Sequence, residues 1–409
     1  DYFLEECNKK QIPYYTELIL GLPEETFYVS EEVKSYFSSH AEELSQKHSE
    51  WKKTFEAWQA ANPDNAKLLE AGLDGIVPQN LNDVIPEFDK EAKLATRAAG
   101  GEVLQPVAEA MPMLVSGSAD LYGSTKNYIK SASDFEPQNN SSEGRNIWYG
   151  IREHGMGAIM NGIAYDGIFR ASGATFAVFA DYLRPSIRLA ALAHLPTIYI
   201  FTHDSIGLGE DGPTHQAVEQ LSSLRLVPGL DVWRPADTQE TAAAWREAIL
   251  SQERPIAFAL SRQTLKEIPK TKRQISNISR GGYVVYGDSS NPDAIIIATG
   301  SEVSISVSAA EQLKIKGLNI RVISMPCQEV YERQTLAYKN KCIPKNFDNI
   351  LAIESGIGDS WHKFVGKKGA MISMESFGLS GTGSDVMNHF GFSVSNIKKN
   401  INKLIKKNR

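Results

Sequence analysis

The fold of this chain is decided by residues 197–219, Thr-Ile-Tyr-Ile-Phe-Thr-His-Asp-Ser-Ile-Gly-Leu-Gly-Glu-Asp-Gly-Pro-Thr-His-Gln-Ala-Val-Glu. The first six residues are apolar, β-branched or aromatic, which predicts a buried strand. A loop with three glycines follows, and a helix is expected to begin near Gln216. Because open α/β sheets bind ligands at the carboxyl ends of their strands, this loop is a candidate site.

The loop contains the densest polar cluster of the chain. Two histidines and three carboxylates lie within thirteen residues: His203, Asp204, Glu210, Asp211 and His215. A solvated surface loop is the alternative interpretation, since charged, glycine-rich loops are common at protein surfaces.

The composition fits a globular protein of two or three domains. The 409 residues are 42% hydrophobic and 22% charged, with a formal net charge of -6. That charge argues against nucleic-acid binding, and neither a membrane-spanning run nor a secretory signal is evident. Cys7, Cys327 and Cys342 lack metal-type spacing, so a reducing, cytoplasmic location is expected. The start at Asp1 suggests a fragment or a trimmed product.

Strands and helices are expected to alternate from about residue 92 onward. Strands are predicted near 114–115, 146–149, 174–178, 197–201 and 257–260, then at 282–286, 294–298, 319–324 and 349–354, with helices at 96–111, from 152 and at 303–316. Residues 273–280 are interpreted as a polar bridge. The predicted fold class is α/β, with two tandem open, mostly parallel sheets that carry helices on both faces. These sheets are expected in 92–270 and 281–409.

Residues 1–91 are predicted to be a helical lead-in and linker. The segment 30–60 is polar and favours helix, and Ser30 is a helix-start signal. Trp51, Phe55 and Trp58 recur at helical spacing, which predicts a packed face.

Seven ordered segments of the chain stand out as motifs. They are Gly-Ser-Ala-Asp-Leu at 117–121, Tyr-Gly-Ile-Arg-Glu at 149–153, Ala-Thr-Phe at 174–176, the loop at 203–216, Leu-Ser-Arg-Gln at 260–263, Ala-Thr-Gly-Ser-Glu at 298–302 and Phe-Gly-Phe at 390–392. Together they resemble the transketolase family. The resemblance implies a thiamine diphosphate-dependent transferase of the pentose phosphate pathway, which moves a two-carbon ketol unit between sugar phosphates. It further implies a pyrimidine-binding domain with the thiamine diphosphate-binding fold, a transketolase C-terminal domain, and a homodimer with the active site at the subunit interface.

The resemblance does not extend to the family's N-terminal domain. There a Gly-Asp-Gly segment with a downstream asparagine binds the diphosphate and its Mg²⁺, and the Asp-Gly pairs at 74, 166 and 211 lack that context. We therefore expect this diphosphate-binding domain to be absent and its Mg²⁺ ligands to lie in a missing domain or another subunit. Residues 1–26 receive no assignment.

The resemblance assigns several residues to the thiamine diphosphate site. Activation of this cofactor needs a carboxyl at the pyrimidine N1′, which favours the imino form of its 4′-amino group, and Glu153 matches that position. Phe176, Phe179 and Tyr182 match the aromatic pyrimidine pocket, and their spacing suggests one side of a helical turn. Asp120 matches a residue near the thiazolium. Judged from the residues alone, Glu153 could instead be a carboxylate stabilised at a helix start. The three aromatic residues could be ordinary core, and Asp120 could be a loop cap.

The resemblance also assigns the substrate contacts. The phosphate of the sugar is expected to meet Arg97, Ser124, His203 and Arg262, since arginine suits phosphate through forked hydrogen bonds. Asp211 matches a residue that recognises a sugar hydroxyl, and His215 a catalytic residue near the ketose carbonyl that shuttles protons. For the arginines, ordinary salt bridges are the alternative. No metal ligand is assigned in this chain.

Two other functions remain open at this point. A dihydroxyacetone synthase, which uses formaldehyde as acceptor, is suggested by Gly-Ser-Thr at 123–125 where the family has Pro-Ser-Asn. The complete set of expected phosphate contacts argues against this function, because formaldehyde has no phosphate. A catalytically silent regulatory or binding subunit is the other possibility, and the presence of Glu153 and His203 argues against that.

Overall fold

The computed structural model describes residues 9, 27–75, 77–139, 142–287 and 290–408. The chain divides into two compact units, Asp1–Lys67 and Leu68–Arg409, and each is described by itself. Within these described ranges, no helix combines the length and apolar character that a membrane crossing requires.

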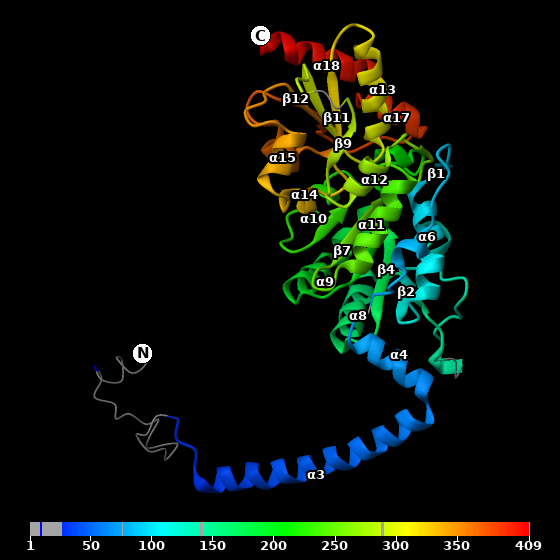
Figure 1. Ribbon diagram of the computed structural model, residues 1–409, viewed down its shortest axis with the longest axis vertical. Helices are drawn as coiled ribbons and strands as arrows, with labels where there is room; N and C mark the ends of the chain where they lie inside the picture. The colour runs from blue at the N-terminus through cyan, green and yellow to red at the C-terminus, as the bar shows by residue number, and fades with distance from the viewer. Residues whose placement is uncertain (1–8, 10–26, 76, 140–141, 288–289, 409) are drawn as a thin grey trace. The chain divides into compact units, whose positions relative to one another are not determined.

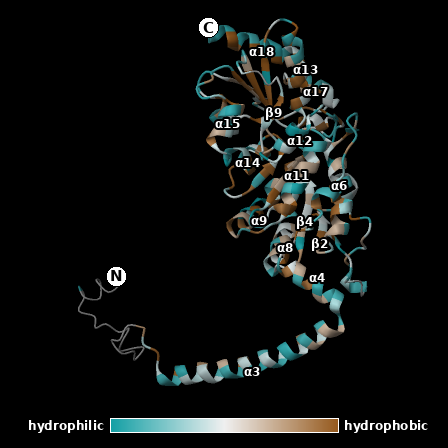
Figure 2. Ribbon diagram, in the orientation of Figure 1, coloured by the Kyte–Doolittle hydropathy of each residue, from teal (hydrophilic) through white to brown (hydrophobic). Residues whose placement is uncertain are grey.

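The first unit contains the long helix α3 (Glu31–Ala61), as the sequence predicts, and the Ser30 side chain caps its start. α4 (Pro63–Leu73) follows it in the chain. No residue of α3 is buried, and Figure 2 colours most of it hydrophilic. Trp51 is 57% exposed, and the rings of Trp51, Phe55 and Trp58 stack on one another along the helix. The prediction of a packed aromatic face is therefore wrong for the described part of this unit.

A six-stranded sheet, parallel throughout, forms the first half of the second unit. Its strands in sheet order are β3 (Asn146–Trp148), β2 (Leu114–Ser118), β4 (Arg170–Phe176), β5 (Ile198–Thr202), β7 (Ile256–Leu260) and β6 (Asp231–Trp233). Every residue of β2, β4, β5 and β7 is buried, which explains their runs of apolar and small residues. The parallel direction places the carboxyl ends of these strands at one edge.

Helices cover both faces of this sheet. They are α6 (Thr96–Ala110), α8 (Glu153–Asp166), α9 (Ala180–Leu192) and α11 (Thr238–Leu250), with short helices α5 (Leu81–Val84), α7 (Tyr122–Thr125) and α10 (Gln220–Leu224). Successive residues of β5 point to opposite faces of the sheet and enter two separate cores. Ile200 packs in the cluster that includes α6 and α11, and Phe201 packs in the cluster that includes α8 and α9. In Figure 1 these helix pairs lie around the strands.

A second, five-stranded sheet follows. Its strands in sheet order are β13 (Ala370–Met374), β12 (Ile350–Ile357), β10 (Ala294–Ala298), β11 (Ile320–Ser324) and β9 (Tyr283–Tyr286), of which β9 is antiparallel and the rest parallel. The accompanying helices are α13 (Glu302–Lys314), α14 (Gln328–Glu332), α15 (Leu336–Cys342), α16 (His362–Val365), α17 (Gly383–His389) and α18 (Val394–Lys407). Figure 1 shows α13 and α18 together, with α15 across the sheet from them. The predicted α/β class with two mostly parallel sheets is confirmed.

Several local predictions were wrong. The helix expected from Gln216 begins at Gln220, because the Val218 backbone N–H donates to Gln220 Oε1 and not to a carbonyl oxygen one turn earlier. The supposed polar bridge contains α12 (Lys272–Ile278), which a capping box starts. The predicted strand at 174–178 is the end of β4, which stops at 176. A small antiparallel pair, β1 (Lys93–Leu94) with β8 (Leu265–Lys266), was not foreseen.

A buried ion network joins the two sheets. Arg234, which follows β6, donates from Nε to Asp204 at 2.8 Å and also forms an ion pair with Glu302 at the start of α13. Nearby, Arg225 forms two hydrogen bonds of 2.6 and 2.8 Å with Glu354 on β12. Burial raises the pKa of Glu354, but Arg225, together with Arg234 and the Trp361 side chain, outweighs it and holds that pKa below its usual value. Asp204, although part of the polar loop, therefore serves the junction between the sheets.

Candidate active site

The residues predicted to form the site gather at the carboxyl edge of the first sheet. Asp120 and Ser124 follow β2, and Glu153 follows β3. Phe176 is the last residue of β4, and Phe179 lies three residues after it. His203, Asp211 and His215 follow β5, Arg262 follows β7, and Arg97 lies in the first turn of α6. Parallel strands that share one direction explain how segments far apart in sequence meet here.

Glu153 is the first residue of α8 and is only 8% exposed. The Thr175 hydroxyl donates to its Oε1 at 3.4 Å, and no second protein hydrogen bond to this carboxyl is found in the described ranges. A helix N-terminus stabilises a nearby negative charge. The carboxyl is thus held in place and keeps an oxygen for a ligand. Thr175 was missed as a site residue, although it lies inside the Ala-Thr-Phe segment.

Phe176, Phe179, His203 and His215 form a cluster of aromatic rings next to Thr175. The rings of Phe176 and Phe179 are parallel to within 8°, with centroids 5.9 Å apart. His215 meets both rings edge-on, at 6.2 and 5.7 Å, and the His203 ring stacks on Phe176 at 3.7 Å. Phe176 and His203 are buried, so these contacts pack both imidazoles against aromatic rings at the sheet edge.

Tyr182 is more peripheral than the sequence suggests. Its ring is 6.1 Å from that of Phe179, but the residue is 65% exposed. The expectation that Phe176, Phe179 and Tyr182 share one side of a helical turn is wrong. The chain changes there from strand to 3-10 turn to α-helix, so the i, i+3, i+6 spacing does not describe one helix.

His203 is buried in a left-handed backbone conformation, with φ +60°. Its Nδ1 lies 2.8 Å from the Thr202 hydroxyl and its Nε2 3.5 Å from Arg97 Nη1. Arginine can only donate, so Nε2 is assigned as the acceptor and Nδ1 as the protonated nitrogen. Burial, and then the charges of Arg97 and Arg262, lower the pKa of His203 from 6.5 to about 3. The ring is therefore neutral near pH 7.

This lowered pKa predicts how stability depends on pH. The unfolded chain takes up a proton at His203 below its ordinary pKa, whereas the folded chain does not until near pH 3. The stabilisation is present above pH 6.5 and is lost as the pH falls, at up to about 1.4 kcal/mol per pH unit. His203→Asn, which tolerates the left-handed backbone, should flatten the stability profile between pH 6.5 and 4.5 in urea unfolding.

The matched control for this test is His194→Asn. His194 also has a left-handed backbone, with φ +56°, but it is exposed. Its replacement should leave the slope of stability against pH as in the unsubstituted chain. An unchanged slope in His203→Asn would contradict the burial of a neutral imidazole.

Arg97 connects three of the predicted phosphate contacts. Its Nη1 donates to the Ser124 backbone oxygen at 2.8 Å and approaches His203. Burial, followed by the charge of Arg262, lowers the pKa of Arg97, and Asp211 opposes this effect. Neither Arg97 nor Arg262 forms an ion pair within the part of the chain that the structure describes. The salt-bridge alternative for these arginines therefore has no support here.

The remaining predicted residues lie at the rim. Asp120, with φ +62°, and Asp211 are both exposed, and neither hydrogen-bonds to another predicted site residue in the described ranges. Arg262 is exposed and lines a pocket of about 490 Å³ together with Gln263 and Asn388. The structure thus brings Arg97, Ser124, His203, His215 and the two phenylalanines together, and leaves the two aspartates and Tyr182 at the solvent boundary.

The loop after β5 is ordered by packing against the second half of the unit. Gly209 has φ +87°, and a Cβ there would lie 2.7 Å from the Gly383 backbone nitrogen, so only glycine fits. Gln216 donates to the oxygens of Gly209 and Leu379. The loop is therefore held in place rather than free in solvent. Among the described residues, no group of three or more His, Cys, Asp or Glu side chains is arranged to hold a metal ion.

The fold and the site together define an α/β protein. The carboxyl edge of its six-stranded sheet combines a buried carboxyl, parallel aromatic rings and an arginine–histidine pair. The family profile "Transketolase, pyrimidine binding domain" matches residues 92–267, and "Transketolase-like TK C-terminal domain" matches 281–393. The chain belongs to the transketolase family.

Individual relatives agree with these matches. The chain is 50% identical over 379 residues to a transketolase of Dictyostelium discoideum, and 43% identical over 387 residues to one of Bacillus subtilis. These alignments cover 92% and 94% of this chain but 57% and 58% of the relatives. A solved transketolase of Pichia stipitis, in complex with sedoheptulose 7-phosphate, has a TM-score of 0.88 at 36% identity and covers 94% of this chain and 57% of that one. The chain thus spans little more than half the length of the relatives it matches.

The predicted absence of the family's N-terminal domain is wrong. A third profile, "Transketolase, thiamine diphosphate binding domain", matches residues 13–78, which include α3 and part of the segment that received no assignment. The prediction relied on the Gly-Asp-Gly segment alone, and the described part of this region consists largely of helix without such a motif. The chain therefore contains a portion of that domain. Of the matched residues, 13–26 and 76 lie outside the described ranges.

Proposed function

We propose that this chain is the pyrimidine-binding and C-terminal portion of a transketolase. The reaction is the transfer of a two-carbon ketol unit from a ketose phosphate to an aldose phosphate, with thiamine diphosphate as cofactor. The observation that carries this proposal is the position of buried Glu153 at the same sheet edge as the parallel rings of Phe176 and Phe179. The relatives are named transketolases and the solved one is a complex with sedoheptulose 7-phosphate, which supports the same reaction.

The residues present fit the pyrimidine end of thiamine diphosphate. The cofactor, when bound, supplies a thiazolium carbon that carries the transferred unit. Glu153 would hold a proton at the pyrimidine N1′, because its carboxyl is buried and accepts, among the described residues, one hydrogen bond, from Thr175. Phe176, Phe179 and Tyr182 would flank the pyrimidine ring, and Asp120 would lie toward the thiazolium.

The substrate would lie next to Arg97 and His203 at the carboxyl edge of the first sheet. Arg97, Ser124, His203 and Arg262 would bind the phosphate, with neutral His203 positioned by Arg97 rather than adding charge. Asp211 would recognise a sugar hydroxyl at the rim, and His215 would move a proton at the ketose carbonyl. All these assignments are proposals based on the edge geometry and the family match.

The remaining parts of the enzyme follow from the same proposal. Residues 1–91 would be a helical lead-in and linker. Residues 92–270 would be the pyrimidine-binding domain, and 281–409 the C-terminal domain. Mg²⁺ and the diphosphate would be bound by the rest of the N-terminal domain, since the chain has no Gly-Asp-Gly segment. A cytoplasmic homodimer with the active site at its interface, acting in the pentose phosphate pathway, is the assembly that the family suggests.

Substrate selectivity tests this proposal directly. Arg262→Ala should reduce kcat/KM for phosphorylated sugars by roughly 10- to 150-fold, the effect of losing one charged hydrogen bond. The rate with hydroxypyruvate, which has no phosphate, should change little. Asp211→Ala should instead weaken discrimination between sugar stereoisomers and keep the preference for phosphate. Steady-state kinetics with the two donor classes measures both effects.

The control for Arg262→Ala is Lys266→Ala, which removes an exposed cation on the adjoining short strand β8. It should preserve both rates. If Arg262→Ala depresses the hydroxypyruvate rate as much as the sugar phosphate rate in a normally folded protein, the phosphate assignment fails. Activity with formaldehyde as the preferred acceptor would favour the dihydroxyacetone synthase alternative.

A further inference from the structure

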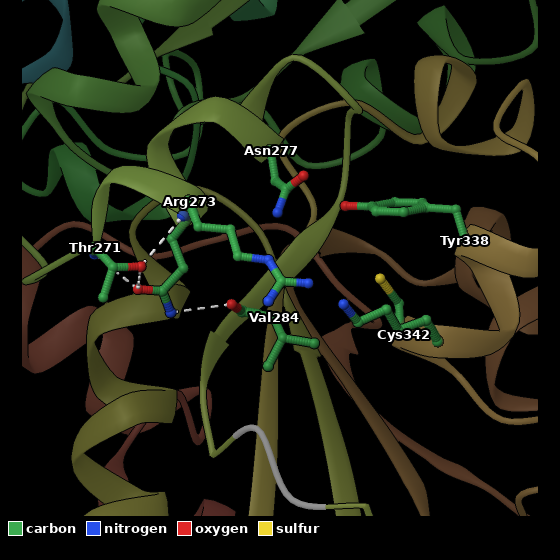
Figure 3. A pocket seen from close by; sticks show the side chains of 8 residues that line it. Thr271, Arg273, Asn277, Val284, Tyr338 and Cys342 are labelled. Carbon is green, nitrogen blue, oxygen red and sulfur yellow. Dashed lines mark hydrogen bonds between the residues drawn. The ribbon is translucent and has the colours of Figure 1, made fainter.

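A pocket of about 310 Å³ lies beside the second sheet, between α12, β9 and α15. The residues that line it are Thr271, Arg273, Gln274, Asn277, Val284, Tyr338, Lys341 and Cys342. None of them belongs to the site at the carboxyl edge of the first sheet. Figure 3 shows the Arg273 side chain extending from α12 toward the side of the pocket formed by Tyr338 and Cys342.

The pocket is positively charged. Arg273 and Lys341 line it from opposite elements, and neither has a carboxylate partner in the described ranges. A third cation, Arg280, lies 4.6 Å from the centre of the Tyr338 ring. No aspartate or glutamate is among the described residues that line the pocket. Two cations that face one cavity favour an anionic ligand.

Hydrogen bonds fix the frame of the pocket. The Gln274 side chain donates to the backbone oxygens of Val284 and Val285 at 3.1 and 2.8 Å, which attaches α12 to β9. The Tyr338 hydroxyl donates to the Gly282 oxygen at 2.9 Å, which attaches α15 to the start of the same strand. The walls that carry Arg273 and Lys341 are therefore tied to one strand, and little reorganisation is needed for binding.

The two other titratable side chains among the described lining residues, Cys342 and Tyr338, are neutral near pH 7. Burial raises the pKa of the Cys342 thiol above its ordinary value. Burial also raises the pKa of the Tyr338 hydroxyl. Both groups thus stay neutral, and the Tyr338 ring and Val284 supply apolar surface next to the two cations.

We propose that this pocket binds a small phosphorylated metabolite, with its phosphate between Arg273 and Lys341. A guanidinium matches phosphate oxygens through forked hydrogen bonds, and an ammonium adds a compact charge. The Asn277 amide, which lines the pocket from α12, would contact the polar body of the ligand. The volume is near the lower end for ligand pockets, so the ligand is small.

Hydrogen exchange on the full chain tests this inference locally. Glycerol 3-phosphate is the probe, and glycerol at the same concentration and ionic strength is the uncharged comparison. The probe should slow amide exchange in 271–286 and 336–343, and glycerol should not. In the double variant Arg273→Ala/Lys341→Ala, the concentration for half-maximal protection should rise by about 10-fold or more, as expected for lost charged hydrogen bonds.

Two control variants separate this site from the one at the first sheet. Lys345→Ala removes an exposed cation close to α15 that does not line the pocket, and it should retain the protection. Arg97→Ala should lose any protection of 203–216 and keep that of the pocket segments. Equal protection of the pocket segments in the double variant and the original chain would overturn the inference, as would their failure to respond to the probe. Stronger protection by malonate, a small dicarboxylate, would overturn the preference for phosphate.

Discussion

Replacing Glu153 by glutamine is expected to lower turnover by about 100-fold or more in the assembled enzyme, in which the rest of the N-terminal domain is supplied. Glutamine has nearly the same volume and can keep the contact with Thr175, so the fold should be preserved. What it loses is the ability to share a proton with the pyrimidine N1′. Turnover at saturating sugar phosphate and cofactor measures the loss, and excess thiamine diphosphate should not restore it.

The control for this substitution is Glu109→Gln, which changes an exposed carboxyl near the end of α6. Its turnover should match that of the unsubstituted enzyme. Near-normal turnover of Glu153→Gln at saturating cofactor would mean that this carboxyl does not activate the pyrimidine, and the assignment of the site would be wrong.

The second large effect is expected on stability, from Arg234→Met. Arg234 is fully buried and faces Asp204 and Glu302, with Glu354 at 3.8 Å. Methionine fills part of the space but leaves these carboxyls without their cation. Removal of one partner from a buried ion network costs about 3–5 kcal/mol in the free energy of unfolding. Urea unfolding followed by circular dichroism measures this change.

An exposed ion pair provides the comparison. Lys368 and Asp348 are 2.8 Å apart, with side chains 63% and 47% exposed. Lys368→Met should cost less than about 1 kcal/mol, because solvent screens the pair. Should Arg234→Met be no more destabilising than Lys368→Met, the buried network would not be what joins the two sheets.

Much of the fold follows from local sequence pattern. β5 and β7 are short runs of apolar residues that are buried on both faces of a parallel sheet, and such runs are visible in the sequence. β6 was missed because it has only three residues and begins with Asp231. The polar character of α12 concealed a helix that the Thr271 capping box defines.

The sequence suggests candidate residues for the site but not the contacts among them. The family segments point to Glu153 and His203, yet the stacking of His203 on Phe176 depends on the pairing of β4 with β5. The partnership of Asp204 with Arg234 joins residues 30 positions apart, and no local pattern reveals it. In α3, helical spacing of aromatic residues predicts amphipathic character, but it does not say what covers them.

We propose that this chain supplies the pyrimidine-binding part of a ketol-transferring active site. The most direct measurement is the rate of ketol transfer by a fusion in which the preceding part of the Dictyostelium discoideum transketolase is joined to this chain. We expect transfer from a ketose phosphate to an aldose phosphate that requires thiamine diphosphate and is largely abolished by Glu153→Gln. A folded fusion that binds the cofactor but transfers no two-carbon unit would contradict the account.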